Sequence, residues 1–136
     1  MDAQQIAVAH ACMAGAYAGE RSFPEILGAL GAAGIEGYIV DYRRSLATYY
    51  APDGDSCEVP CEPTAAKVAD RFDPAEIAAN IRQAQIGGPD YSYRGFCERV
   101  KAAGCAGYQV SLLGRRAVYF GRSGETHVEL FPQPAE

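Results

Sequence analysis

The residues best suited to chemistry lie near the end of the chain, in the stretch His127-Val128-Glu129. Side chains two positions apart share one face of a β-strand, so His127 and Glu129 are expected to lie together. A histidine with a pKa near neutrality beside a carboxylate can act as a general acid or base. Nucleophilic catalysis also needs a positioned serine or cysteine, and Ser111 is the candidate that the predicted strand register brings near. The stretch therefore predicts a polar binding site, or a small hydrolase or isomerase.

A repeat at an offset of seventy residues indicates which elements position these side chains. Residues 23–56 align without a gap on residues 93–126 with nine identities in thirty-four positions, where average composition would give roughly two or three. Ala32-Ala33-Gly34 meets Ala102-Ala103-Gly104, and Gly37-Tyr38 meets Gly107-Tyr108. A tandem duplication is the economical interpretation.

Each copy has the same pattern of predicted elements. Apolar residues at helical spacing precede Gly34 and Gly104, which suit the left-handed position after a helix. Two alternating stretches follow, at 38–43 and 46–51 in the first copy and at 108–113 and 116–121 in the second. Further helices are predicted over 3–17 and from Asp73-Pro74 to about Gln85, with third strands at 56–59 and 125–130. The sequence predicts an α+β fold: a single domain over 1–136 made of two pseudo-repeats, about 1–70 and 71–136, with helices packed on one face of an antiparallel sheet.

The predicted strand register divides the sheet into a core face and an open face. A two-residue turn at Gly114-Arg115 pairs Leu113 with Arg116. The core face then holds the strand residues that are identical between copies, together with Thr126, Val128 and Leu130. The open face differs between copies, and its polar residues form the candidate ligand site: Asp41, Tyr50, Gln109, Ser111, His127 and Glu129. This face is interpreted as a solvated or homodimer surface, a ligand groove, or a catalytic site.

Composition excludes several classes of protein. Twelve basic against seventeen acidic residues give a net charge of −5, and the basic pairs Arg43-Arg44 and Arg115-Arg116 are too short for a nucleic-acid surface. No apolar run reaches the roughly 20 residues of a membrane span. The start of the chain lacks the basic stretch of a signal peptide, so a cytoplasmic location is expected.

The sequence also predicts no metal or cofactor. The chain has two histidines and no cysteine pair at zinc-finger spacing, and its glycines do not form a dinucleotide-binding fingerprint. Cys97 and Cys105 are predicted core residues, and Cys57 and Cys61 are predicted free thiols.

Several short motifs resemble the YbcV-like family, a bacterial family of unknown function with members in prophages that are labelled phage envelope protein. The motifs cover nearly the whole chain: Ala33-Gly34, Tyr38, Val40-Asp41, Tyr49, Ile81-Arg82-Gln83-Ala84-Gln85, Tyr93, Phe96, Ala103-Gly104, Tyr108, Tyr119-Phe120-Gly121, Gly124-Glu125, His127-Val128-Glu129 and Phe131-Pro132. The segment from Cys57 to Cys61 departs from the family pattern. The family has no established activity, so the resemblance implies no catalytic residue and no cofactor.

A non-enzymatic module that binds a small effector molecule is the leading hypothesis, because duplicated units around a twofold axis form a groove between their halves. By analogy of architecture only, similar duplicated units occur in bacterial effector-binding domains. The alternatives are a hydrolase or isomerase that uses His127 and Glu129, and a dimerising interaction protein without a ligand.

Overall fold

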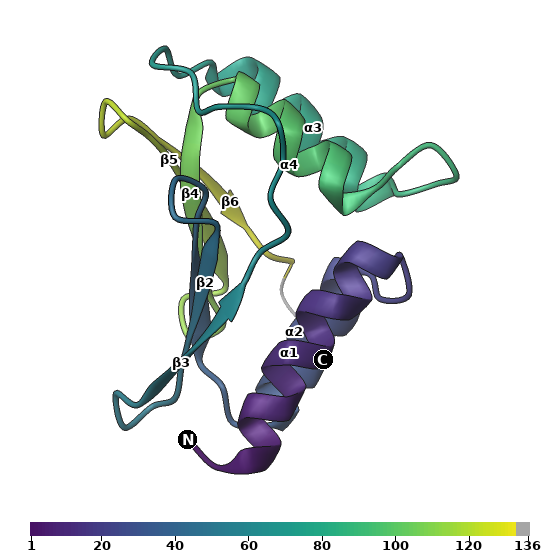
Figure 1. The fold of residues 1–136 in the computed structure, drawn as a ribbon, viewed down its shortest axis with the longest axis vertical. Helices are drawn as coiled ribbons and strands as arrows, with labels where there is room; N and C mark the ends of the chain where they lie inside the picture. Colours follow the sequence, from purple (N-terminus) through teal and green to yellow (C-terminus); the bar gives the residue numbers. More distant parts are fainter. Residues whose placement is uncertain (133–136) are drawn as a thin grey trace.

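The computed structural model describes residues 1–132, so residues 133–136 of the predicted domain lie outside the described part. Two helices and three strands follow one another twice along this part (Figure 1). The elements are α1 (Ala3–Ala18), α2 (Phe23–Ala32), β1 (Gly37–Asp41), β2 (Leu46–Tyr50), β3 (Ser56–Pro60), α3 (Pro74–Ile86), α4 (Tyr93–Ala102), β4 (Cys105–Ser111), β5 (Arg116–Gly121) and β6 (Thr126–Leu130). The α+β class is confirmed.

The elements of the two halves recur at nearly constant spacing. α2 and β3 recur seventy residues later as α4 and β6, with the same lengths. The spacing is sixty-eight for the first helices, since their C-caps are Gly19 and Gly87. The burial pattern agrees with a spacing of sixty-eight residues. The buried residues Ala9, Cys12 and Met13 of α1 correspond to the buried residues Ile77, Asn80 and Ile81 of α3. The connection from α3 to α4 is therefore two residues longer than that from α1 to α2.

Side chains at the start of each helix satisfy backbone N–H groups that have no partner within the helix. The N-caps are Asp2, Ser22, Asp73 and Ser92, and each accepts a hydrogen bond from the backbone three residues on. Asp73 precedes Pro74 at the first helical position, as predicted. The helix starts are thus encoded locally in the sequence.

The six strands form one antiparallel sheet in the order β3-β2-β1-β4-β5-β6. The halves meet where β1 pairs with β4, so an approximate twofold axis passes between these strands. A Cβ atom at Gly37 would collide with the carbonyl oxygen of Val110, and one at Gly107 with that of Val40. The identity of these two glycines between the halves follows from this close approach of the central strands.

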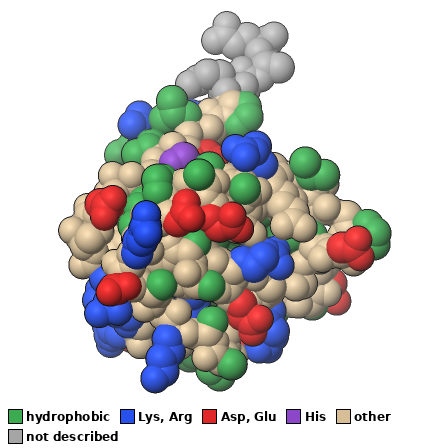
Figure 2. All heavy atoms as spheres, turned by 90° about the horizontal axis from the view of Figure 1, so that it is seen from above, with side chains coloured by type: hydrophobic (Ala, Val, Ile, Leu, Met, Phe, Trp, Pro, Cys, Tyr) green, Lys and Arg blue, Asp and Glu red, His purple; other side chains and the backbone are tan. Residues whose placement is uncertain are grey.

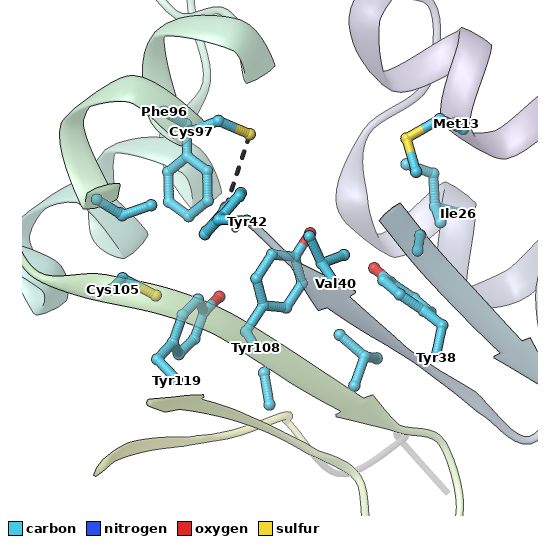
Figure 3. Close-up of a cluster of buried hydrophobic side chains, with 14 of the residues drawn as sticks. Met13, Ile26, Tyr38, Val40, Tyr42, Phe96, Cys97, Cys105, Tyr108 and Tyr119 are labelled. Carbon is cyan, nitrogen blue, oxygen red and sulfur yellow. Dashed lines mark hydrogen bonds between the residues drawn. The ribbon is translucent and has the colours of Figure 1, made fainter. Parts of the chain in front are cut away.

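All four helices lie on one side of the sheet, with α1 and α2 as one pair and α3 and α4 as the other (Figure 1). The tyrosines of the covered face stand up from the strands toward the helices, between Phe96 on one side and Met13 and Ile26 on the other (Figure 3). The six strand residues predicted as core are buried: Tyr38, Val40, Tyr49, Tyr108, Val110 and Tyr119. The predicted burial of Cys97 and Cys105 is also confirmed.

The predicted two-residue turn between β4 and β5 is wrong. Ser111 pairs with Arg116, and the loop between them has four residues. The left-handed residue is Arg115, with a φ of 50°, and its counterpart Ser45 has a φ of 53°. The register differs from the prediction by two residues, so the faces of β4 and β5 stay as predicted.

Within residues 1–132, no helix combines the length and the apolar character that crossing a membrane would take. On the face seen from above, acidic and basic side chains are interspersed (Figure 2).

Candidate functional site

The side chains of β6, the third strand of the second half, point to the opposite faces of the sheet from those predicted. His127 pairs with Tyr119 and Glu129 with Ala117, and directly paired residues point to the same side of a sheet. His127 and Glu129 therefore lie on the face that the helices cover, while Val128 is 46% exposed on the open face. The cause is the turn after β5, in which five residues, 121–125, separate the paired Phe120 and Thr126.

The six predicted site residues are consequently divided between the two faces. Asp41, Tyr50, Gln109 and Ser111 lie on the open face, which separates Ser111 from His127 by the thickness of the sheet. The hydroxyl of Ser111 accepts a hydrogen bond from the Gly114 N–H at 2.8 Å, so it holds the hairpin turn. Ser111 and His127 therefore do not form the nucleophile and base pair that the predicted register would bring together.

A cavity of about 550 Å³ lies on the covered face, between the two helix pairs and the sheet. Its walls come from α1 and the start of α2 on one side and from the end of α3 and the start of α4 on the other. The loops 19–22 and 87–92 contribute to it on either side. In Figure 1 the two helix pairs come near each other at the ends that carry these loops and lie farther apart next to the sheet. The cavity thus lies at the junction of the two halves.

Aromatic side chains dominate the lining. The chain has nine tyrosines and five phenylalanines, and ten of these fourteen line the cavity. The ten are Tyr17, Phe23, Tyr38, Tyr49, Tyr91, Tyr93, Phe96, Tyr108, Tyr119 and Phe131. Six of them form pairs seventy residues apart, such as Tyr38 with Tyr108 and Tyr49 with Tyr119. Both halves therefore contribute equivalent walls.

The floor of the cavity is a row of rings across the sheet. Ring centroids are 4.9 Å apart between Tyr49 and Tyr38, 6.1 Å between Tyr38 and Tyr108, and 5.2 Å between Tyr108 and Tyr119. The Tyr93 and Tyr108 hydroxyls are hydrogen-bonded at 2.6 Å. Burial raises the pKa of each tyrosine in the row, so these phenols stay neutral. The floor therefore presents the ends of closely packed rings with neutral hydroxyls.

Glu129 is the carboxylate that β6 brings to this cavity. Its Oε1 accepts a hydrogen bond from the Gln85 side chain of α3, which also lines the cavity. Burial raises the pKa of the Glu129 carboxyl above its ordinary value, and the bond from Gln85 partly opposes this shift. The Glu129 charge in turn raises the pKa of Tyr119. The carboxylate thus lies at the edge of the aromatic floor, half withdrawn from water.

Arg21 adds one positive charge to the lining. Its Nη1 donates to Cys12 Sγ at 3.3 Å, and its aliphatic carbons lie against Gly15. The exposed residues Glu20 and Glu25 complete the charged lining. Among residues 1–132, three carboxylates against one guanidinium give the lining a negative balance.

The described lining contains Glu129 without His127, the other residue of the predicted polar pair. His127 lies beside Tyr119, with ring centroids 6.5 Å apart, and is not among the described lining residues. Within residues 1–132, no three histidine, cysteine, aspartate or glutamate side chains come together as a metal site would need. All five cysteines are free thiols, and burial raises the pKa of Cys61 to about 11 and that of Cys105 to about 12. Their thiols are therefore protonated and weakly nucleophilic near neutral pH.

Sequence reasoning placed the tyrosines in the core but missed the cavity that they line. A usable signal was the recurrence of large apolar residues at the helix starts, where Phe23 and Ile26 correspond to Tyr93 and Phe96. These positions line the same cavity as the strand tyrosines. Comparison with known proteins adds no assignment, since no family model and no curated protein matches the chain.

Proposed function

We propose that this protein is a non-enzymatic binding module that holds a small, largely apolar molecule between its two halves. The observation that carries the proposal is the cavity of about 550 Å³ lined by ten aromatic residues. Small-molecule sites typically have volumes of roughly 300–1,000 Å³ and apolar walls with a few polar groups. Glu129, Gln85 and the tyrosine hydroxyls are such groups.

The position of the cavity supports the same function. Walls from both helix pairs mean that a bound molecule would contact both halves at once. Such a ligand would stabilise the folded chain by mass action, because the unfolded chain has no cavity. Binding would also tie the loops 19–22 and 87–92 to each other through the ligand.

Blocking the cavity tests the proposal. Ala84 lies half-buried on α3 and lines the cavity, while Ala79 on the same helix is exposed and lies outside the lining. The neutral dye Nile red serves as the probe, since its fluorescence rises in an apolar environment. We expect Ala84→Trp to remove the fluorescence increase and Ala79→Trp to preserve it. Equal dye binding by both variants would show that the dye binds elsewhere and would refute the cavity as the site.

A further inference from the structure

We propose that the cavity selects organic monocations, namely protonated amines on an apolar or aromatic body, and that Glu129 receives the ammonium group. This inference rests on the proposed function, since it concerns the ligand of the same cavity. It adds the charge of that ligand and the residue that recognises the charge.

The first support is that the Glu129 carboxylate has no cationic partner within residues 1–132. The two ion pairs in this part of the chain join the N-terminal amine to Asp55 and Arg94 to Glu62. Gln85 donates to Oε1 of Glu129, and no residue among 1–132 donates to the other oxygen. A carboxylate partly withdrawn from water is stabilised by a cation that donates a hydrogen bond. A protonated amine supplies both the charge and the donor.

The second support is the chemistry of the floor. The hydroxyl oxygens of the neutral floor tyrosines can accept a hydrogen bond from an ammonium group. Tyr119 lies next to Glu129, because its partner on β6, His127, is two residues from Glu129 on the same face. An ammonium at Glu129 would therefore also lie over the aromatic floor, and the apolar body of the ligand would extend toward Tyr108 and Tyr38.

The third support is the fixed position of the one positive side chain in the lining. Arg21 belongs to the α1–α2 loop of the first half, whereas Glu129 belongs to β6 of the second. The guanidinium of Arg21 is bonded to Cys12, and its stem covers Gly15. The cavity therefore has a negative group at its β6 side, which would repel an anionic ligand there.

Three compounds with one body and different head groups separate charge from shape. They are 4-phenylbutylamine, 4-phenylbutanol and 4-phenylbutyrate, which carry an ammonium, a hydroxyl and a carboxylate at pH 7. Isothermal titration calorimetry gives the Kd of each for the wild-type protein. We expect the amine to bind at least about tenfold more tightly than the alcohol, which is about 1.4 kcal/mol. The carboxylate is expected to bind most weakly.

Two charge-matched variants assign this preference to a residue. Glu129→Gln should bring the Kd of the amine to that of the alcohol and leave the alcohol unchanged. Glu58→Gln removes the same charge from an exposed position on β3 and should preserve the preference. Equal binding of amine and alcohol by the wild-type protein would overturn the cation proposal. So would an amine preference that survives in Glu129→Gln, or no binding of the amine at millimolar concentration.

The Nile red comparison of Ala84→Trp with Ala79→Trp distinguishes this failure from failure of the proposed function. If the dye separates those two variants while the amine shows no preference, the cavity binds neutral molecules. If the dye binds both variants equally, the binding function itself is refuted.

Discussion

The two halves of the molecule have the same architecture but carry different polar residues at equivalent positions. Their strands present the same tyrosines to the helices, and both halves line the shared cavity with equivalent rings. The third strands differ, since β3 presents Val59 to the covered face where β6 presents Glu129. The first helices differ in parallel, because Tyr17 of α1 corresponds to Gln85 of α3 at the sixty-eight-residue spacing.

The difference shows how a symmetric fold can hold an asymmetric site. In the first half, the Tyr17 hydroxyl accepts a hydrogen bond from the Glu62 N–H beyond β3, and Val59 is buried. In the second half, the amide of Gln85 reaches the carboxylate of Glu129. The shared residues line the cavity, and the residues that differ place its polar groups asymmetrically.

The largest expected effect tests the part that the halves share. Truncating Tyr119 or its counterpart Tyr49 to alanine removes a buried ring from the floor, and either change should cost about 3–5 kcal/mol in the free energy of unfolding. Tyr50→Ala on the open face is the control and should cost about 1 kcal/mol or less. Urea unfolding measures all three. A large difference between Tyr49→Ala and Tyr119→Ala would mean that the halves do not share the core equally.

A reciprocal exchange tests the part that differs. Val59 is 3% exposed, so Val59→Glu places a carboxylate in a buried site without an amide partner. We expect a loss of about 3 kcal/mol, because burying an uncompensated polar group is costly. Glu129→Val at the equivalent position should change stability by less than about 1 kcal/mol, since Glu129 is only half-buried. Equal tolerance of both changes in urea unfolding would contradict the asymmetry.

The junction between the halves gives the next effect. Gly37→Ala and Gly107→Ala should each cost about 1–3 kcal/mol, because the added Cβ would push β1 and β4 apart. Gly28 on α2 has open space around it, so Gly28→Ala should be neutral or stabilise the fold by up to about 1 kcal/mol. Thermal unfolding of the three variants measures this order. If Gly107→Ala is as stable as Gly28→Ala, the close approach of the central strands does not constrain the fold.

The fold was largely predictable because its signals are local. Alternation identified the tyrosines of the covered face, Asp73-Pro74 identified a helix start, and the repeat transferred each assignment to the other half. The face of β6 was not predictable in this way. One residue more or less in the 121–125 turn reverses which side chains point inward, and the sequence of the turn does not fix its length.

The cavity could not be predicted from the sequence for a different reason. Filled cores and aromatic cavities use the same residue types, and strand alternation cannot tell a ring that packs against a helix from one that borders a void. The volume depends on how far the helix pairs diverge, which is a property of the whole fold. Glu129 was a predicted polar candidate and lines the cavity, but its partner Gln85 is forty-four residues away and comes close only through the packing of α3 near β6.

The smallest expected effect is a pH dependence of the unfolding free energy that comes from Glu129, a carboxylate that only the second half has at this position. Burial raises the pKa of Glu129 in the folded chain above its value in the unfolded chain, so the folded state binds this proton more tightly. The unfolding free energy therefore falls as pH rises from the ordinary glutamate pKa through the raised one, and it stays at the lower level above that range. Glu129→Gln removes this fall, and its stability advantage should be near zero at low pH and below about 1 kcal/mol at pH 7, since solvent screens the half-exposed group.

Urea unfolding of the wild-type protein, Glu129→Gln and Glu58→Gln across this pH range isolates the contribution, because the two variants remove the same charge from different positions. Arg21, Glu20 and Glu25, the other charged groups of the lining, are also unchanged. A pH-independent difference between the wild-type protein and Glu129→Gln would show that burial does not raise this pKa.

With 4-phenylbutylamine bound, the sign of the pH dependence of stability should reverse, since ionisation of Glu129 strengthens its attraction for the ammonium. Stability of the free protein would then fall, and affinity for the amine rise, over the same pH range, because one ionisation controls both.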